Sequence, residues 1–312
     1  MPGTRRPRPA LLALAVTLVG GAALAGGTFL ASAGSGSGPS DMPAVSTAAL
    51  ERLHRLPPVT DLMFSGTDVQ ARSAEAQRRY AITCMAREGY RYAPKAADRP
   101  DPGRDERPRP FGLETAPSGT APAAPEPAGE TPPKPGSPEA SPAYAQALFG
   151  DEGKRVTVKG RRGMKVSRPG AGCLAEAEER VLGDGRLRWL QVRIELFEGQ
   201  EFARAAVERD PAFQDATGRW ERCLERAGFP GQHDPVTLLK SLPSQRARLE
   251  GRDVLKADLR CKSETGYLST AYTRLAAVQQ SWLDANPALA KDWAALLARQ
   301  DKAARQVLAA RG

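Results

Sequence analysis

The four cysteines are the residues of this chain whose spacing says most about its chemistry. One lies in the segment Cys84-Met-Ala-Arg-Glu-Gly-Tyr90, and another lies in Cys223-Leu-Glu-Arg-Ala-Gly-Phe229. The two segments share the cysteine, an apolar neighbour, an arginine, a glycine and an aromatic residue. Each is followed downstream by one further cysteine, Cys173 or Cys261. This pattern indicates two related helical units that each hold one cysteine pair.

Four cysteines allow three disulfide pairings, and sequence alone does not choose among them. The repeat favours pairing within each unit, which gives Cys84–Cys173 and Cys223–Cys261. The first bridge would close a loop of roughly 90 residues, which the chain-entropy model rates at about 4–5 kcal/mol. A zinc site is an alternative, but zinc ligands usually come in close pairs and the nearest two cysteines here are 38 positions apart. Buried free thiols remain a further alternative.

The strongest concentration of charge lies in residues 154–168, which hold seven cations and no acid. Val156 and Val158, then Met164 and Val166, alternate around a turn that contains glycine, so the segment is predicted to be a β-hairpin. On such a ribbon several cations share a face and could bind an anionic polymer or a lipid headgroup. A solvated hairpin without a ligand is the alternative. The candidate anion-binding residues are Lys154, Arg155, Lys159, Arg161, Arg162, Lys165 and Arg168.

Residues suited to catalysis are scarce. Without a usable histidine, an ordinary serine or cysteine triad has no base, and we expect both histidines, His54 and His233, to be solvated loop residues. Glycosidase chemistry needs two carboxylates that flank the substrate. The candidates lie on apparently exposed helix faces, where surface salt bridges explain them: Glu176, Glu178, Glu179, Glu195 and Glu198. We therefore expect no catalytic residue, cofactor or metal site.

The N-terminus has the features of an export signal. Arg5, Arg6 and Arg8 precede an apolar run from Ala10 to Leu30, and the small-x-small pattern at residues 31–33 fits a cleavage site. The apolar run is also long enough to span a bilayer. We expect residues 1–33 to be a signal peptide or membrane anchor, which places the rest outside the cytoplasm, in the cell envelope or the extracellular space.

Helix signals are strong in the remaining chain. A helix is predicted over about 68–88, and Asp210-Pro, Asp234-Pro and Asn286-Pro each mark a capped helix start. One long helix is predicted over about 253–282, and it should pack with the last helix as an antiparallel hairpin. By contrast, fourteen of the 27 prolines lie between residues 94 and 142, which predicts an extended and mobile insertion.

These elements predict a mainly α fold of two disulfide-linked helical units with one small β-hairpin. The expected divisions are 1–33 (signal peptide or membrane anchor), 34–67 (flexible linker), 68–93 (first helix), 94–142 (disordered proline-rich insertion), 143–209 (hairpin and helices that complete the first unit) and 210–312 (second unit, with a C-terminal helical hairpin).

Several segments together carry a family resemblance. They are the export signal, the Ala-Leu-Phe-Gly150 turn, Gly172-Cys-Leu-Ala-Glu-Ala177 with Leu-Gly-Asp184 after it, and the repeated Cys-x-x-Arg-x-Gly-aromatic motif. With these, roughly residues 76–285 resemble a group of uncharacterised exported actinobacterial proteins, many of them lipoproteins. This chain differs in having no cysteine for lipid attachment after its apolar run. The resemblance implies no known activity and transfers no catalytic residue.

The formal charge is +9, and the three N-terminal arginines supply part of it. A basic exported protein favours anionic surfaces, whereas 6% aromatics and no basic-aromatic interleaving argue against nucleic acid. The leading expectation is a non-enzymatic cell-envelope binding protein that binds an anionic envelope polymer or lipid headgroups. It could also bind another envelope protein through its C-terminal helices. The alternatives are an accessory subunit of an exporter or envelope sensor, and a carboxylate-based wall hydrolase.

Overall fold

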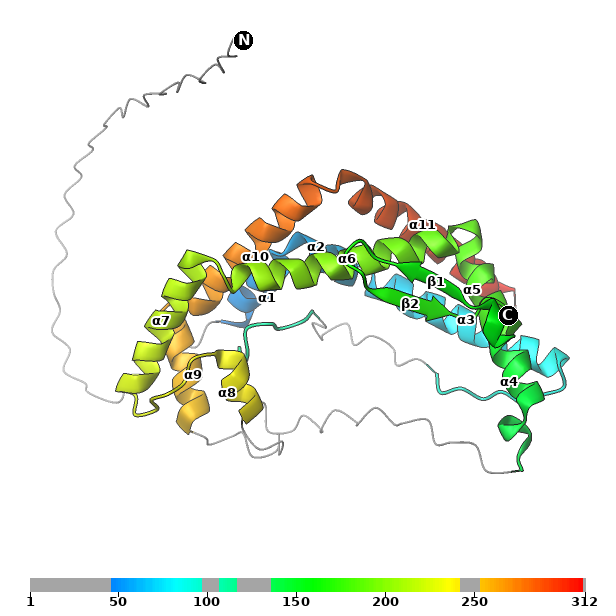
Figure 1. Cartoon of the computed structure of the whole chain (residues 1–312), viewed down its shortest axis with the longest axis horizontal. Coiled ribbons are helices and arrows are strands. Elements are labelled where there is room, and N and C mark those ends of the chain that lie inside the picture. The colour runs from blue at the N-terminus through cyan, green and yellow to red at the C-terminus, as the bar shows by residue number, and fades with distance from the viewer. Residues whose placement is uncertain (1–45, 97–106, 117–135, 242–252, 311–312) are drawn as a thin grey trace, which may run out of the picture. The chain divides into compact units, whose positions relative to one another are not determined.

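The computed structural model describes residues 46–96, 107–116, 136–241 and 253–310, all of which belong to one compact unit, Met42–Gly312. Helices make up most of these residues, and their only sheet is a two-stranded hairpin (Figure 1). The mainly α fold with a small β-hairpin is therefore confirmed. The predicted signal peptide or anchor, residues 1–33, lies outside the described residues.

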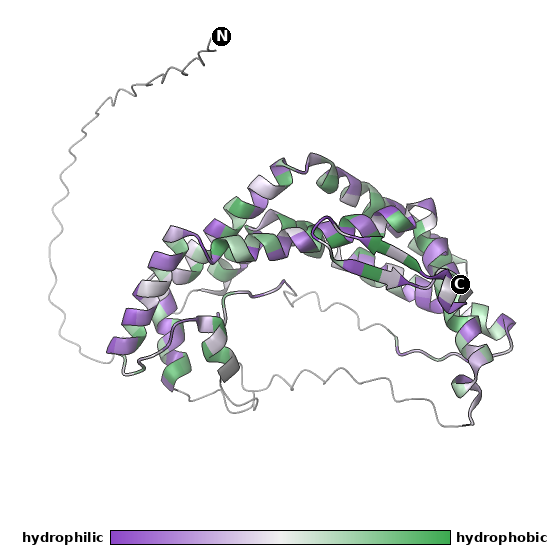
Figure 2. Cartoon of the chain, viewed as in Figure 1, coloured by the Kyte–Doolittle hydropathy of each residue, from purple (hydrophilic) through white to green (hydrophobic). Residues whose placement is uncertain are grey.

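The elements are mostly helices, along which apolar residues recur between polar ones, as amphipathic packing requires (Figure 2). Their bounds are α1 Thr47–Arg55, α2 Pro58–Phe64, α3 Thr67–Arg87, η1 Pro138–Ala140, α4 Pro142–Phe149, η2 Glu152–Lys154, β1 Val156–Lys159, β2 Lys165–Arg168, α5 Gly172–Leu182, η3 Gly183–Gly185, α6 Arg186–Val207, α7 Pro211–Arg226, α8 Pro235–Ser241, α9 Asp253–Glu264, α10 Tyr267–Asp284 and α11 Pro287–Ala309.

The order of elements repeats between α3–α6 and α7–α10. Each set has a helix with a cysteine near its end, a short helix that opens at a proline, a helix with the second cysteine, and a longer helix. Disulfides join Cys84 to Cys173 and Cys223 to Cys261, with Cα atoms 5.5 and 5.6 Å apart. The predicted pairing is confirmed, and no described cysteine is free.

The repeated motif builds the same helix end in both places. Gly89 and Gly228 follow α3 and α7 with φ of 82° and 89°, a backbone conformation that side chains with a Cβ rarely adopt. The backbone N–H of Tyr90 and that of Phe229 each donate to the carbonyl five residues earlier at 2.9 Å. The aromatic residue of the motif then packs near its own disulfide, in the cores that hold Cys84 and Cys223.

The two sets share a packed interior through their long helices, because α6 lies against α10. One core surrounds Trp220, Tyr267 and Tyr272, and a second lies between α6, α2, α11 and the inner face of the hairpin. A smaller core surrounds the Cys84–Cys173 bridge. The last helix, α11, packs against α3 and α5. Residues 210–312 therefore do not form a body separate from residues 68–209.

Three predicted segments need correction. Residues 34–67 are not linker throughout, because α1 and α2 occupy much of 46–67 and bury Leu50 and Val59. The buried Gln279 side chain accepts hydrogen bonds from the backbone N–H of Val59 and that of Thr60, at 2.9 and 3.1 Å. This long-range cap replaces the local side-chain cap that α2 lacks. Residues 34–45 lie outside the described part.

The proline-rich insertion also contains ordered structure. Residues 107–116, which we call the strap, place Phe111 and Glu114 in the interior at 4% and 5% exposure. The Phe111 ring contacts Phe213 and Tyr272, with centroid distances of 5.7 and 5.0 Å. One large aromatic side chain with a prepared site can thus order a segment whose composition predicts disorder. The end of the predicted insertion, 136–142, also contains helical structure, in η1 and the first residue of α4, whereas residues 97–106 and 117–135 lie outside the described residues.

The single helix expected over 253–282 is wrong at Gly266. This glycine has a φ of 63° and separates α9 from α10. The expected antiparallel hairpin of the last two helices is also wrong, since α11 packs mainly against α3 and α5 instead of back along α10. At the start of α11, Asn286 does not cap the helix with its side chain, and instead donates from Nδ2 to the Trp282 carbonyl at 2.8 Å.

Candidate functional site

The basic hairpin has an inner and an outer face. Antiparallel pairing sets Val158 opposite Val166 and Lys159 opposite Lys165. Because side chains alternate along a strand, the valines fall on one face and the lysines on the other. Val158 is 9% exposed and joins the α6 core, with Val166 packed beside it. The hairpin is thus held to α6 by its valines, and its other face is left to solvent.

Three of the seven candidate cations share the outer face. They are Arg155, Lys159 and Lys165, and all three are exposed. Arg155 is oriented by Ser167, which accepts from the arginine Nε through its Oγ at 3.0 Å and from Nη2 through its carbonyl at 3.3 Å. The two lysines face each other across the ladder and make no ion pair with any other described residue.

The other four cations are arranged differently. Arg161 reaches α6 and the start of α11, since its Nε lies 3.5 Å from Glu195 and its Nη1 donates to Asn286 Oδ1 at 2.6 Å. Arg162 lies over the Phe202 ring at 4.8 Å. Arg168 lies 3.9 Å from Glu178, and Lys154 precedes the hairpin in η2. The sequence pattern predicted one patch of seven cations, but the structure brings only three of them onto one face.

Two of the carboxylates predicted to be surface residues, Glu195 and Glu198, are buried under the hairpin turn. They are 4% and 5% exposed, so that prediction is wrong. The Glu198 carboxylate accepts from the backbone N–H of Arg162 and that of Met164, both at 3.0 Å. Gly160 makes room for it, since a Cβ there would lie 2.3 Å from Glu198 Oε1. The backbone donors of the turn therefore already hold an anion from the chain itself.

Glu195 lies one helical turn away on the same side of α6. It accepts from Gln191 Nε2 at 2.6 Å, and its second oxygen, Oε2, is buried without a hydrogen-bond partner among the described residues. The pair Glu195 and Glu198 thus supports the hairpin turn. The other three candidate carboxylates lie on α5, where Glu176 pairs with Arg87 and Glu178 with Arg186.

The base of the hairpin is closed by glycines. A Cβ at Gly170 would lie 1.7 Å from the Lys154 carbonyl oxygen, and a Cβ at Gly172 would lie 2.4 Å from the Gly150 nitrogen. Backbone can approach backbone this closely only where no side chain intervenes. With the turn held by Glu198 and the base closed by glycines, the outer face is fixed at both ends.

A buried polar network lies in the core that holds the Cys223–Cys261 disulfide. It includes His54, which we expected to be solvated. His54 is 5% exposed, and its Nε2 lies 2.5 Å from Glu114 Oε2. The second oxygen of Glu114 accepts from Tyr272 Oη at 2.6 Å. The sequence did not reveal this network because His54 lies 60 positions before Glu114 and Tyr272 lies 158 positions after it. His233 is solvated as expected, at 81% side-chain exposure.

A buried ion pair lies next to this network. Lys262 Nζ donates to Asp258 Oδ2 at 2.9 Å and to the Leu113 carbonyl of the strap at 2.5 Å, while Trp220 Nε1 donates to Asp258 Oδ1 at 2.9 Å. Burial raises the pKa of Asp258 and lowers that of Lys262, and each opposes the shift of the other. The strap is therefore fastened to α1, α9 and α10 by charged groups.

The described residues contain no group of three or more histidine, cysteine or acidic side chains placed to hold a metal ion. Within the same residues, no helix has both the length and the hydropathy needed to cross a membrane. The two disulfides are consistent with an oxidising environment. In the comparisons with known proteins, no family model, curated protein or solved structure matches this chain.

Proposed function

We propose that this chain is an exported, non-enzymatic binding protein of the cell envelope whose hairpin binds a repeated anionic group through its outer face. Phosphates of an envelope polymer and those of lipid headgroups share this chemistry. The observation that carries the proposal is the pair Lys159 and Lys165, directly opposite each other with no acidic partner among the described residues. Like charges in this position destabilise a hairpin. An anion bound between the two ammonium groups would convert their repulsion into attraction.

The supporting residues favour a surface with several anions over a single small ion. Arg155 continues the row along the same face, and its Ser167 contacts hold the guanidinium in place while leaving further N–H donors for a ligand. The turn itself offers little to a small anion, because Glu198 already accepts from its backbone N–H groups. The contacts would thus come from side chains spread along the strands, a geometry suited to a repeating ligand.

Export supports the same proposal. Disulfides persist in oxidising compartments, and this chain forms two of them. The apolar N-terminal run after three arginines gives the expected route out of the cytoplasm.

Sedimentation of the full-length, disulfide-oxidised protein tests the proposal. One arm uses vesicles of phosphatidylglycerol in phosphatidylcholine, a second uses phosphatidylcholine alone, and a third uses immobilised polyphosphate. We expect binding to an anionic arm at low salt, release at high salt and no binding to phosphatidylcholine. The anionic arm that binds identifies the source of the phosphate, and binding to neither would contradict the proposal.

The matched control separates the hairpin from overall charge. The variant Lys159→Gln/Lys165→Gln should lose binding. The variant Lys256→Gln/Lys302→Gln, which removes two exposed charges from α9 and α11, should bind as the unmodified chain does. Equal loss in both variants would show that net charge, not the hairpin, controls binding.

A further inference from the structure

Helix α4 presents an uncharged, largely apolar surface to solvent. Its Tyr144 and Leu148 are buried in the core around the first disulfide. The opposite side of the helix carries residues that recur at each turn, and all of them are exposed: Pro142, Ala145, Gln146 and Phe149. The Phe149 residue, at the end of the helix, is 46% exposed. The helix thus buries one apolar face and leaves a second face open to solvent.

Tyrosines that are only partly buried lie beside this helix. Four of the chain's six tyrosines belong to the core that α4 covers. Tyr144 is buried, and its ring meets that of Tyr90 edge to face, with centroids 5.3 Å apart. Tyr80, Tyr90 and Tyr92 are partly exposed. A tyrosine combines an apolar ring with a polar hydroxyl, so tyrosines are enriched where a protein meets the boundary between lipid and water.

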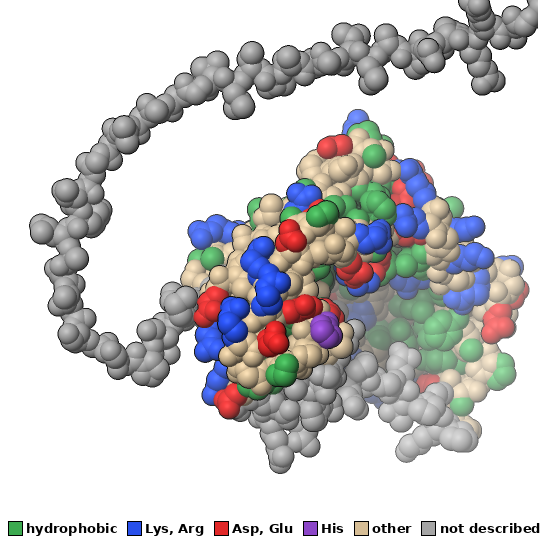
Figure 3. All heavy atoms as spheres, turned by 60° about the vertical axis from the view of Figure 1, so that its left-hand side comes forward, with side chains coloured by type: hydrophobic (Ala, Val, Ile, Leu, Met, Phe, Trp, Pro, Cys, Tyr) green, Lys and Arg blue, Asp and Glu red, His purple; other side chains and the backbone are tan. Residues whose placement is uncertain are grey.

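The exposed face of α4 adjoins the base of the hairpin. Gly150 follows α4, and a Cβ there would lie 2.5 Å from the Ala171 carbonyl carbon, so the end of the helix touches the segment that leaves β2. Only residues 150–155 separate Phe149 from β1. Figure 1 places α4 below the hairpin, and Figure 3 shows hydrophobic side chains gathered below Lys and Arg side chains at its right-hand end. Apolar and basic surfaces thus meet at one end of the molecule.

The charges at this end attract an anionic surface through the hairpin and not through α4. Around α4 and its tyrosines, acids and bases nearly balance: Glu88, Glu139, Asp151 and Glu152 against Arg91, Lys95 and Lys154, with Arg87 paired to Glu176 at 3.1 Å. The excess of positive charge begins on the outer face of the hairpin, with Arg155, Lys159 and Lys165. An anionic surface held by these cations would therefore meet a nearly neutral, apolar helix beside them.

We propose that α4 and the outer face of the hairpin dock together on an anionic lipid bilayer. This inference rests on the function proposed above, and it names lipid headgroups, rather than a soluble polymer, as the source of the phosphate. The hairpin cations contact the headgroups, Phe149 enters the boundary with the acyl chains, and the tyrosines lie at headgroup level. A phosphate polymer would offer the cations the same anions but nothing apolar to α4.

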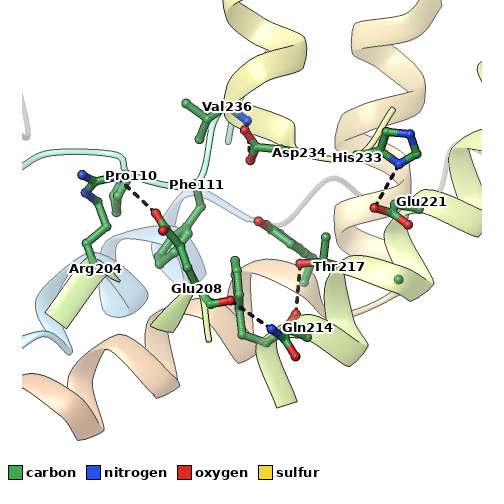
Figure 4. Close-up of a pocket in the computed structure, with 13 residues that line it drawn as sticks. Pro110, Phe111, Arg204, Glu208, Gln214, Thr217, Glu221, His233, Asp234 and Val236 are labelled. Atoms are coloured by element: carbon green, nitrogen blue, oxygen red, sulfur yellow. Dashed lines mark hydrogen bonds and ion pairs between the residues drawn. The ribbon is translucent and has the colours of Figure 1, made fainter. Parts of the chain in front are cut away.

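A position-specific label tests this docking. Sedimentation alone does not locate the contact, because the apolar run of residues 10–30 is itself long enough to enter a bilayer. The full-length oxidised protein therefore carries the environment-sensitive fluorophore nitrobenzoxadiazole on one introduced cysteine. The variant Gln146→Cys places it on the exposed face of α4. The matched control, Gln214→Cys, places it on α7 at the other end of the molecule, where Figure 4 shows Gln214 beside Glu208.

Vesicles of phosphatidylglycerol in phosphatidylcholine should raise the emission of the label at position 146 and shift it to shorter wavelength, with no change at position 214. Neither label should respond to polyphosphate. A chain that binds polyphosphate but gives no response at position 146 would overturn this inference and leave the proposed function intact. Equal responses at both positions would show unspecific adsorption and overturn it. Emission already shifted without vesicles would show that the chain itself covers this face, with the same consequence.

A pair of phenylalanine variants measures the contribution of the exposed ring. Phe149→Ala should weaken vesicle binding about four- to tenfold, since a half-exposed ring still gains part of its transfer energy on burial. Its binding to polyphosphate should not change. The matched control is Phe197→Ala, because this ring is 40% exposed and lies two residues after Glu195, on the side of α6 that faces away from the hairpin. Equal loss in both variants, or in neither, would overturn the docking.

The hairpin variant Lys159→Gln/Lys165→Gln tests whether the two surfaces act together. In this variant the label at position 146 should no longer respond to the anionic vesicles. A response that persists would separate α4 from the hairpin and overturn their joint docking.

Discussion

Substituting Lys165→Glu should strengthen the hairpin and abolish its binding to anions at the same time. Position 165 lies directly opposite Lys159, so the change replaces a like-charge pair by an opposite-charge pair. Cross-strand ion pairs contribute about 0.2–1 kcal/mol, and like charges oppose by a similar amount. Both side chains are exposed, and screening reduces the effect. We therefore expect a gain of about 0.5–1 kcal/mol in the free energy of unfolding.

The same substitution changes the charge of the outer face by two units. Each basic residue near an anionic membrane contributes about 1 kcal/mol to binding, so the change should weaken it by about 2 kcal/mol, or about 30-fold. Urea unfolding followed by circular dichroism measures the first effect, and vesicle sedimentation measures the second. The matched control is Lys256→Glu on α9, which packs against α7 and α10.

A gain in stability together with a loss of binding distinguishes a ligand-binding lysine pair from a structural one. A variant that is less stable than the unmodified chain would show that the lysine pair is not a source of repulsion. A stable variant that binds vesicles unchanged would show that the outer face does not make the contact. Either result would refute the reasoning for the hairpin.

Three further predictions concern the stability of the fold. Gly170→Ala should lower the free energy of unfolding by about 3 kcal/mol in a urea titration, because the new Cβ would lie 1.7 Å from the Lys154 carbonyl oxygen. Lys262→Met should cost about 3–5 kcal/mol at pH 7, since Asp258 would be buried unpaired, and a loss no smaller at low pH would contradict this. Hydrogen bonds from Arg78 are the largest cause that lowers the pKa of Glu75, to about 2. Glu75 therefore stabilises the fold above its unfolded pKa of about 4.3, and this contribution is lost as the pH falls toward 2. In the variant Glu75→Gln, the free energy of unfolding should fall less steeply with pH in that window.

Much of the architecture could be predicted from local signals. The disulfide pairing followed from the repeated cysteine motif, and Asp210 and Asp234 each cap a helix that begins at the next residue, a proline. Such signals work because the cap and the residues it satisfies lie within one turn of each other. They fail where the partner is distant. The predicted Asn286 cap was wrong because this side chain instead donates to the Trp282 carbonyl and accepts from Arg161.

The candidate site could be predicted only in part, for the same reason. The charges of the hairpin and its strand pattern are local, but the division of seven cations into outer and inner sets depends on how the ribbon lies on α6. Glu198 has the sequence environment of a surface residue and is buried only because a turn 34 and 36 positions earlier covers it. Phe111 and His54 were missed similarly, since the contacts that order them come from α7 and α10, and from the strap.

The most direct test of the central claim observes the hairpin lysines themselves. Reductive methylation with ¹³C-formaldehyde keeps lysine positively charged and gives each methylated lysine its own NMR signal, which can be assigned by single Lys→Arg variants. On addition of the anionic vesicles or polyphosphate that the chain binds, we predict that the signals of Lys159 and Lys165 shift first and together, while that of Lys256 on α9 stays in place. Shifts spread evenly over the surface lysines, or confined to lysines outside the hairpin, would contradict the assignment of the outer face as the binding site.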